Sequence, residues 1–128
     1  MKILALETSA KSVSCAVVED GAPLASAYQC TGLTHSRTLL PMVDAMLKNA
    51  DLTLDDINAI AIAAGPGSFT GLRIGSATAK GLGFALDIPL AAVPTVDALA
   101  YNLYGCEQLI CPMMDARRGC LLYTSPST

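Results

Sequence analysis

The chain has 128 residues, of which 52% are hydrophobic and 15% are charged, and its formal net charge at pH 7 is −3. This composition describes one globular core, excludes a disordered chain, and leaves too few basic residues for independent binding to nucleic acid. The apolar runs are too short to cross a membrane and the first residues lack a signal-peptide core, so we expect a cytoplasmic protein.

The N-terminal segment is predicted to fold as a three-stranded antiparallel meander. Residues 2–8 are a short apolar run that ends in polar residues, and residues 12–19 contain several β-branched valines. Asp20-Gly21 is a strong signal for a hairpin turn, so residues 22–30 are expected to pair back as the third strand.

A helix is predicted from Thr38 to about Ala50. Apolar residues recur there at three- and four-residue spacing and form one stripe: Leu39, Leu40, Val43, Met46 and Leu47. Because proline fits an α-helix best in its first turn, Pro41 places the start near Thr38. The residues from Ser36 to Thr38 are then capping residues or a looser lead-in turn.

The rest of the chain alternates between strand and helix patterns: a strand over 57–64, a helix over 71–86, a strand over 90–93, a helix over 95–104 and a strand over 109–114. Thr95 is the expected cap of the second of these helices, and Pro112 gives the last strand an edge position or an irregular end. The order indicates an α/β fold, a mixed five-stranded sheet with helices packed on it, as in a ribonuclease-H-like or actin-like lobe.

A glycine-rich turn leads into the helix over 71–86. Its residues are Gly65, Pro66, Gly67, Ser68, Phe69 and Thr70. The glycines free the backbone for a sharp turn, Thr70 is the expected cap, and the free amides could hold an anion. The glycine spacing is close to that of a dinucleotide-binding turn, but Pro66 and Phe69 would crowd a pyrophosphate. The alternative is a turn that only reverses the chain.

The helix over 71–86 carries a nearly bare ridge. Its residues recur every four positions on one face: Gly71, Gly75, Ala79 and Gly83. Each interior glycine costs a helix about 1 kcal/mol relative to alanine, so another backbone should come close to this face. Two interpretations stay open, packing within this chain and docking of a helix from a second chain. Under the second, Gly75→Leu is expected to abolish partner binding.

The other polar and sulfur-containing residues give weaker signals. His35 is the single histidine and has no second ligand at metal-binding spacing, and no serine has a histidine and an acid at triad spacing. The five cysteines form no Cys-x-x-Cys pair, so we expect buried thiols in a reducing compartment. The sequence therefore predicts no catalytic residue, no cofactor site and no metal site.

Four segments resemble the TsaB (YeaZ) family. The longest is AGPGSFTGLRIG at residues 64–75. The others are ILALETS at 3–9, HSR at 35–37 with the following Leu40-Pro41, and MDARRG at 114–119. The resemblance extends over residues 1–119 in the order and spacing of the family.

The resemblance implies an actin-like ASKHA fold of two similar lobes, of which residues 1–119 are the N-terminal lobe and the second is missing. It implies a non-catalytic subunit that binds and activates the homologous threonylcarbamoyltransferase TsaD, which modifies tRNA next to the anticodon. TsaE and tRNA would join only through this complex, and ATP and metal would belong to the partner subunits. No membrane association is implied.

The family pairs with TsaD through its first two helices, which form a four-helix bundle with the matching helices of the partner. The implied interface residues are Leu39, Leu40, Val43, Met46, Leu47, Gly71, Arg73, Gly75, Ala79 and Gly83. A homodimer through the same face is the alternative for free chains. The catalytic relatives carry a His-x-x-x-His metal pair on the helix that here begins at Thr95 and has no histidine, so the resemblance favours the partner over the catalyst.

An ASKHA-type phosphotransferase or a glycoprotease-like enzyme is the alternative function. Against a nucleotide role, the first strand ends in Glu7, where the family more often has Asp. Residues 120–128 follow Gly119 without helix caps or charged residues. Their first six residues, CLLYTS, resemble the translation of one reading frame of a transposon sequencing adaptor. We therefore expect a non-native tail on a truncated lobe, which the coding DNA beyond Gly119 would test.

Overall fold

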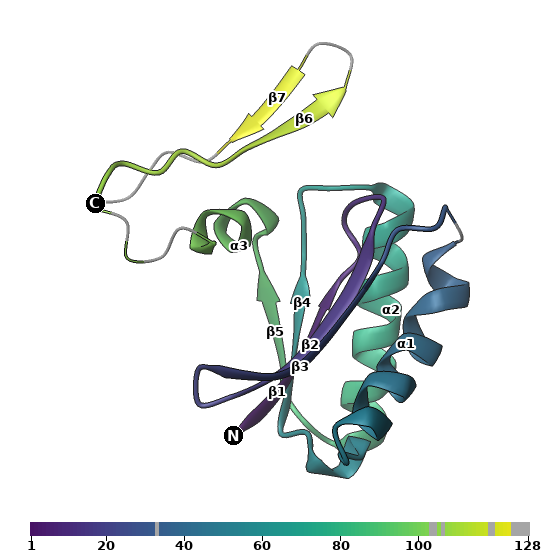
Figure 1. Ribbon diagram of the computed structural model, residues 1–128. Coiled ribbons are helices and arrows are strands. Elements are labelled where there is room, and N and C mark those ends of the chain that lie inside the picture. The colour runs from purple at the N-terminus through teal and green to yellow at the C-terminus, as the bar shows by residue number, and fades with distance from the viewer. Residues whose placement is uncertain (33, 103–104, 106, 118–119, 124–128) are drawn as a thin grey trace.

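The computed structural model describes residues 1–32, 34–102, 105, 107–117 and 120–123. Its elements are β1 (Lys2–Glu7), β2 (Val13–Glu19), β3 (Ala22–Gln29), α1 (His35–Asn49), the short 3-10 helix η1 (Leu54–Asp56), β4 (Ala59–Ala63), α2 (Phe69–Leu86), β5 (Leu90–Val93), α3 (Thr95–Tyr101), β6 (Met113–Arg117) and β7 (Cys120–Tyr123). One sheet has the order β3-β2-β1-β4-β5 (Figure 1). The predicted α/β fold with a mixed five-stranded sheet is confirmed.

The antiparallel half of the sheet is the predicted meander. β1 pairs with β2 so that Lys2 lies opposite Glu19, and β2 pairs with β3 so that Glu19 lies opposite Ala22. Asp20 and Gly21 have φ values of 50° and 83°, the left-handed values that a two-residue hairpin turn requires. The Asp-Gly pair therefore sets the register of β2 and β3.

The other half of the sheet is parallel. β1 pairs with β4, and β4 pairs with β5, both in the same direction. Parallel neighbours need a crossover connection, which α1 and α2 provide. The carboxyl ends of β1, β4 and β5 therefore meet at one end of the sheet, where the glycine-rich turn lies.

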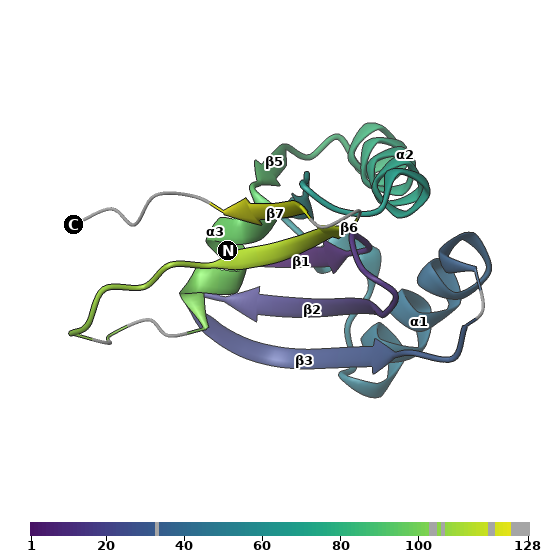
Figure 2. The ribbon, with the colours of Figure 1, turned by 90° about the horizontal axis from the view of Figure 1, so that it is seen from above.

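The hydrophobic core lies between the sheet and two helices. Figures 1 and 2 show α1 and α2 on one face of the sheet and α3 on the other. Alternate residues of β1 and β2 point into this core, and Leu4, Val17 and Ile60 are fully buried. On the opposite face, Ala5 and Ala16 are only half-buried, because α3 is short and covers little of the sheet.

Helix α1 begins at His35, three residues before the predicted start at Thr38. Pro41 therefore lies inside the helix, where its missing N–H removes one hydrogen bond. Thr38 and Leu39 are buried, and the Thr38 hydroxyl donates to the Thr34 carbonyl oxygen at 3.2 Å. The start predicted from Pro41 is wrong because this packing outweighs the local cost of the proline.

The predicted strand over 109–114 is also wrong. β6 begins at Met113, and within the described residues it pairs only with β7, so this hairpin is separate from the main sheet (Figure 1). Helix α3 ends at Tyr101, and the predicted end at residue 104 lies outside the described residues. Of the predicted tail, four residues form β7 and residues 124–128 lie outside the described residues.

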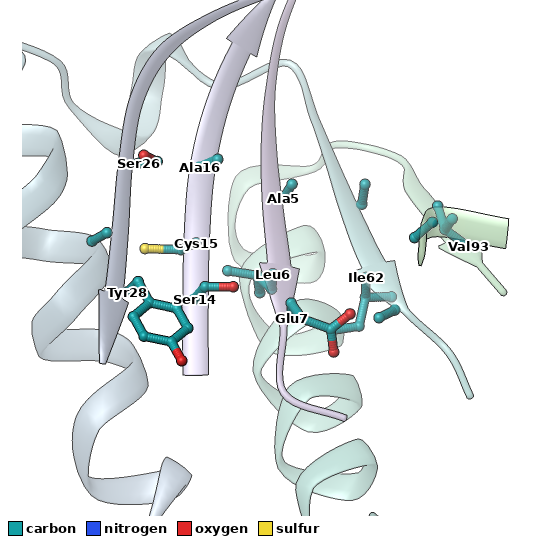
Figure 3. Close-up of a pocket in the computed structure, with 14 residues that line it drawn as sticks. Ala5, Leu6, Glu7, Ser14, Cys15, Ala16, Ser26, Tyr28, Ile62 and Val93 are labelled. Carbon is teal, nitrogen blue, oxygen red and sulfur yellow. The ribbon is translucent and has the colours of Figure 1, made fainter. Parts of the chain in front are cut away.

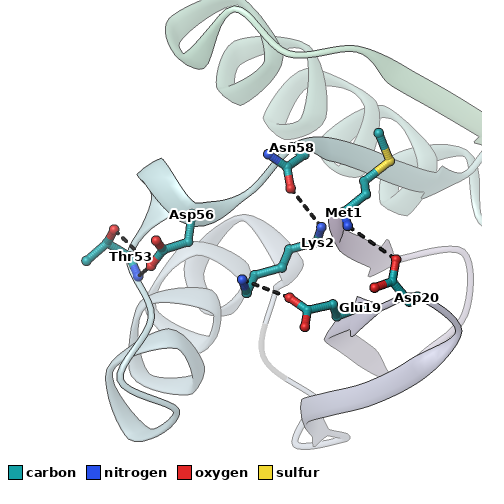
Figure 4. Close-up of polar contacts among 7 residues, drawn as sticks. All are labelled: Met1, Lys2, Glu19, Asp20, Thr53, Asp56 and Asn58. Atoms are coloured by element: carbon teal, nitrogen blue, oxygen red, sulfur yellow. Dashed lines mark hydrogen bonds and ion pairs between the residues drawn. The ribbon is translucent and has the colours of Figure 1, made fainter.

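Polar contacts hold the N-terminus at the opposite end of the sheet from the glycine-rich turn (Figure 4). Lys2 Nζ pairs with Glu19 Oε2 at 2.8 Å, and the Met1 ammonium pairs with Asp20 at 3.3 Å. The side-chain Oδ1 of Asn58 accepts a hydrogen bond from the backbone amide of Lys2, and the backbone amide of Asn58 donates one to the Lys2 carbonyl oxygen, both at 2.8 Å. Because these ion pairs are exposed to solvent, they contribute little to stability, and the contacts mainly fix where β1 begins.

Candidate partner interface

The bare ridge of α2 faces the sheet of this chain. All of its residues are buried: Gly71, Gly75, Ala79 and Gly83. A methyl group at Gly71 or Gly75 would overlap atoms of Thr8, which is fully buried at the end of β1. A methyl group at Gly83 would lie 3.3 Å from the Ile88 carbonyl oxygen. Of the two interpretations of the ridge, packing within the chain accounts for the structure.

The apolar stripe of α1 faces inward as well. Most of it belongs to the hydrophobic core: Leu39, Val43, Met46 and Leu47. Leu40 is the exception, with 51% of its surface exposed. Of the residues predicted to form the interface, only Leu40 and Arg73 are exposed, because residues that pack on their own sheet cannot also face a partner. A partner that docks on these two helices would therefore have to contact their exposed sides.

The outer faces of the two helices expose Leu40 and Arg73 together with residues outside the predicted set. On α1 the exposed residues include Leu40, Pro41, Asp44, Ala45 and Lys48, and on α2 they include Thr70, Arg73, Ala77, Gly81 and Phe84. Phe84 is 92% exposed, and the position where Gly81 would carry a β-carbon has no atom within 4 Å. Ala77, Gly81 and Phe84 follow at four- and three-residue spacing, so they share one side of α2. A helix from another chain can therefore approach this side closely.

The sequence contains a signal for Gly81 and Phe84, which the predicted interface does not include. Gly81 and Phe84 lie on the side of α2 opposite the buried ridge, and because Ala77 and Gly81 are small, this side is a second candidate contact face of the helix. Deciding which face is internal requires the position of Thr8, which is far from α2 in the sequence.

The glycine-rich turn joins three elements. The Ser68 amide donates to the Ser9 carbonyl oxygen at 2.7 Å, in the turn after β1. Gly65 and Thr95 exchange two hydrogen bonds, from the Thr95 amide to the Gly65 carbonyl oxygen at 2.8 Å and from the Gly65 amide to Thr95 Oγ1 at 3.2 Å. Next to Ser9 there is no room for a side chain at Gly67. These contacts support the interpretation of the segment as a turn that reverses the chain and ties α2 and α3 to β1.

Ser68 caps α2. Its Oγ accepts a hydrogen bond from the Gly71 amide at 3.2 Å, so the helix begins at Phe69, before the predicted start at residue 71. Thr70, the predicted cap, lies in the first turn and is exposed. Thr95 likewise is the first residue of α3, which follows Pro94 at the cap position, and its hydroxyl bonds to Gly65 instead.

Comparisons with known proteins decide the family. A family model described as "TsaD: tRNA N6-adenosine threonylcarbamoyltransferase" matches residues 29–126. The tRNA threonylcarbamoyladenosine biosynthesis protein TsaB of Bacillus subtilis is 39% identical over 119 residues, which cover 93% of this chain and 52% of that protein. TsaB of Escherichia coli is 37% identical over 122 residues, with 93% and 52% covered. The chain belongs to the TsaB (YeaZ) family.

Solved structures of the family have the same fold. YeaZ from Pseudomonas aeruginosa aligns with a TM-score of 0.85 and 36% sequence identity, covering 95% of this chain and 58% of that chain. This likeness supports the expected ASKHA-type lobe. The chain spans about half the length of the curated TsaB relatives it matches. Within its described residues, none of the helices combines the length and apolar character that crossing a membrane requires.

In this TsaB-family chain, Glu7 lines a cavity of about 410 Å³ on the sheet face opposite α1 and α2 (Figure 3). Most other side chains in its wall are small, such as those of Ala5, Ser14 and Ala16. The Glu7 carboxylate accepts hydrogen bonds from the Ser9 amide at 2.7 Å and from the Ser9 hydroxyl, so it braces the turn after β1. Among the described residues, no group of three or more His, Cys, Asp or Glu could hold a metal ion.

His35 connects the start of α1 to the turn after β1. Its Nε2 lies 2.7 Å from the Ala10 carbonyl oxygen, and because that oxygen only accepts, Nε2 carries the proton. Its Nδ1 is buried without a partner in the described part of the chain. His35 was predicted to precede the helix, and it is instead the first helical residue.

The thiols differ in their surroundings. Cys15 is buried beside Met46, with 3.7 Å between the two sulfur atoms, and burial raises the pKa of its thiol to about 11. Cys30 and Cys111 are exposed, so the expectation of buried thiols holds for Cys15 but is wrong for these two. The side chains of the remaining two cysteines lie outside the described part of the chain.

Proposed function

We propose that this chain is the first lobe of a non-catalytic subunit that binds and activates a TsaD-type threonylcarbamoyltransferase in tRNA threonylcarbamoyladenosine biosynthesis. The curated relatives are named for that biosynthesis, and the matching family model is named for the transferase itself. A lobe that resembles both proteins indicates that the two are homologous. Homologous lobes can pair through matching faces in a pseudo-twofold arrangement, as identical subunits do.

The docking face in this proposal is the outer side of α1 and α2. Phe84 is the main support for this face, because 92% of its surface is exposed on a long helix. Gly81, one turn before it, leaves open space beside the backbone. Covering a phenylalanine side chain stabilises a complex by about 1.5–3 kcal/mol. Leu40 on α1 adds a second partly exposed apolar side chain on the same side of the sheet.

The chemistry in this proposal belongs to the partner. Helix α3 corresponds to the helix expected to carry paired histidines in the catalytic relatives, and here it reads TVDALAY. This supports placing metal and ATP on the partner subunits, with TsaE joining through the complex. The net charge of −3 supports the assignment of tRNA binding to another subunit of a cytoplasmic assembly.

The experiment is co-purification of the full chain with TsaD, followed by a threonylcarbamoyl transfer assay on tRNA. Phe84→Glu places a charge at the centre of the proposed face and is expected to abolish both co-purification and the stimulation of transfer. Leu99→Glu is the matched control, because Leu99 is 44% exposed on α3 across the sheet. Equal behaviour of the two variants, or transfer by the chain without TsaD, would contradict the proposal.

A further inference from the structure

A groove of about 680 Å³ runs between α2 and the edge strand β5. Its inner surface is apolar and includes Ile62, Leu72 and Ala79. Phe69 and Leu90 stand at its margins, with 73% and 41% of their surfaces exposed. The groove therefore combines a preformed apolar interior with apolar side chains that remain in contact with water.

The strand β5 has one free edge beside this groove. Among the residues that the structure describes, it pairs only with β4, and it is the last strand of its sheet. The Ile60 amide donates to the Pro89 carbonyl oxygen and the Ala64 amide donates to the Val93 carbonyl oxygen, so these two residues of the β5 segment face β4. By the alternation of a strand, Leu90 and Ala92 direct their N–H and C=O groups to the free edge. An added strand could pair with these groups.

Two cations flank the groove. Arg73 and Lys80 line it, and the described residues of its lining include no carboxylate. Among the described residues neither cation is in an ion pair, and the Arg73 guanidinium lies 5.4 Å from the centroid of the Phe69 ring. On a chain with a net charge of −3, this local positive charge favours an acidic partner.

We propose that the groove binds an extended acidic segment of a partner protein by strand addition to β5. The backbone of the segment pairs with Leu90 and Ala92, and every second side chain faces α2. Among these α2-facing side chains an apolar one enters the groove, and acidic ones on either side of it reach Arg73 and Lys80. This surface lies on the β5 side of α2 and shares Arg73 and Ala77 with the outer face of the helix, whereas the proposed TsaD face centres on Gly81 and Phe84. It is therefore a second docking surface that borders the first, and its peptide-binding test does not require TsaD.

The probe is a fluorescein-labelled, C-terminally amidated peptide of sequence ETVTET, whose Glu and Val side chains share one face of a strand. It is titrated into the full chain and followed by fluorescence anisotropy and by amide NMR. We expect saturable binding with shifts centred on the Leu90 and Ala92 amides. The double charge reversal Arg73→Glu and Lys80→Glu is expected to weaken binding about tenfold or more. Lys11→Glu, an exposed charge reversal in the turn after β1, is the control and should bind as the unchanged chain does.

Control peptides and a competitor distinguish strand addition to β5 from other kinds of binding. A KTVTKT peptide should bind at least about tenfold more weakly, since it carries the same charge as the groove margin. An ETVTET peptide methylated on alternate backbone nitrogens cannot pair with β5, so equal binding of this peptide would overturn strand addition. Full displacement by an oligouridine would also overturn it, by assigning the groove to RNA. Phe84→Glu should leave peptide binding unchanged, whatever its effect on TsaD.

Discussion

The hydroxyl of Thr8, at the end of β1, donates a hydrogen bond to the carbonyl oxygen of Gly71 in α2 at 2.7 Å. The helix comes this close because neither Gly71 nor Gly75 has a side chain to hold it away from the fully buried Thr8. The close contact offsets the cost of the ridge glycines to helix stability, about 1 kcal/mol each relative to alanine. The ridge therefore sets the distance between α2 and the sheet.

Replacing a glycine of α2 by alanine should have opposite effects on the free energy of unfolding on the two sides of the helix. At Gly75 it would overlap the Thr8 hydroxyl and lie 2.8 Å from the Ile62 side chain, so Gly75→Ala should lower the free energy of unfolding by about 1–3 kcal/mol. At Gly81 it meets no atom, so Gly81→Ala should raise the free energy of unfolding by about 0.5–1 kcal/mol. Urea unfolding of the two variants measures both values. Equal changes of the same sign would show that the ridge is not in contact with β1.

The N-terminal cap of α2 provides a second matched pair of substitutions, Ser68→Ala and Thr70→Ala. Ser68→Ala removes the acceptor for the Gly71 amide, so the free energy of unfolding should fall by about 1 kcal/mol. Thr70→Ala changes an exposed residue of the first turn and should stay within about 0.5 kcal/mol of the unchanged chain. Thermal or urea unfolding measures the free energy of unfolding of both variants. A larger decrease for Thr70→Ala than for Ser68→Ala would show that Thr70 caps the helix, as the sequence predicts.

Burial of Cys15 links stability to alkaline pH. Its thiol has a pKa of about 11 in the folded chain and an ordinary value of 9.0. Between these values the unfolded chain loses the proton and the folded chain keeps it, so unfolding becomes easier as the pH rises from about 9 to about 11. Stability at pH 7 does not depend on this group, because the thiol is neutral in both states.

The measurement is the free energy of unfolding at pH 8, 9, 10 and 11 for the unchanged chain and for Cys15→Ala, which should show a shallower decline over the same range. At pH 8, iodoacetamide should alkylate the exposed Cys30 and Cys111 well before Cys15. Rapid labelling of Cys15 in the folded chain would contradict its burial.

Local signals in the sequence were sufficient for most of the fold. The Asp20-Gly21 turn needs left-handed backbone angles at both positions, and this residue pair predicts the hairpin directly. The strand predicted over 90–93 has the observed bounds, because Pro89 and Pro94 enclose it. The start of α1 could not be predicted in the same way, since the burial of Thr38 and Leu39 depends on a sheet formed by distant residues.

The candidate site was harder to predict than the fold. Spacing shows which residues share a face of a helix, but it does not show whether that face is internal. Gly75 and Gly81 look alike in the sequence, yet one lies against Thr8 and the other beside open space. Only the path of β1, which brings Thr8 to α2, distinguishes the two glycines.

The measurement that tests the proposed docking face most directly is calorimetric titration of TsaD with the unchanged chain, Gly81→Ala and Gly81→Leu. The fold has room for a side chain at this position, so both variants should remain folded. If the outer side of α2 contacts a TsaD helix, Gly81→Leu should weaken binding by about tenfold or more, equivalent to about 1.4 kcal/mol, and Gly81→Ala should weaken it less. Unchanged affinity for Gly81→Leu would show that TsaD does not dock on this face.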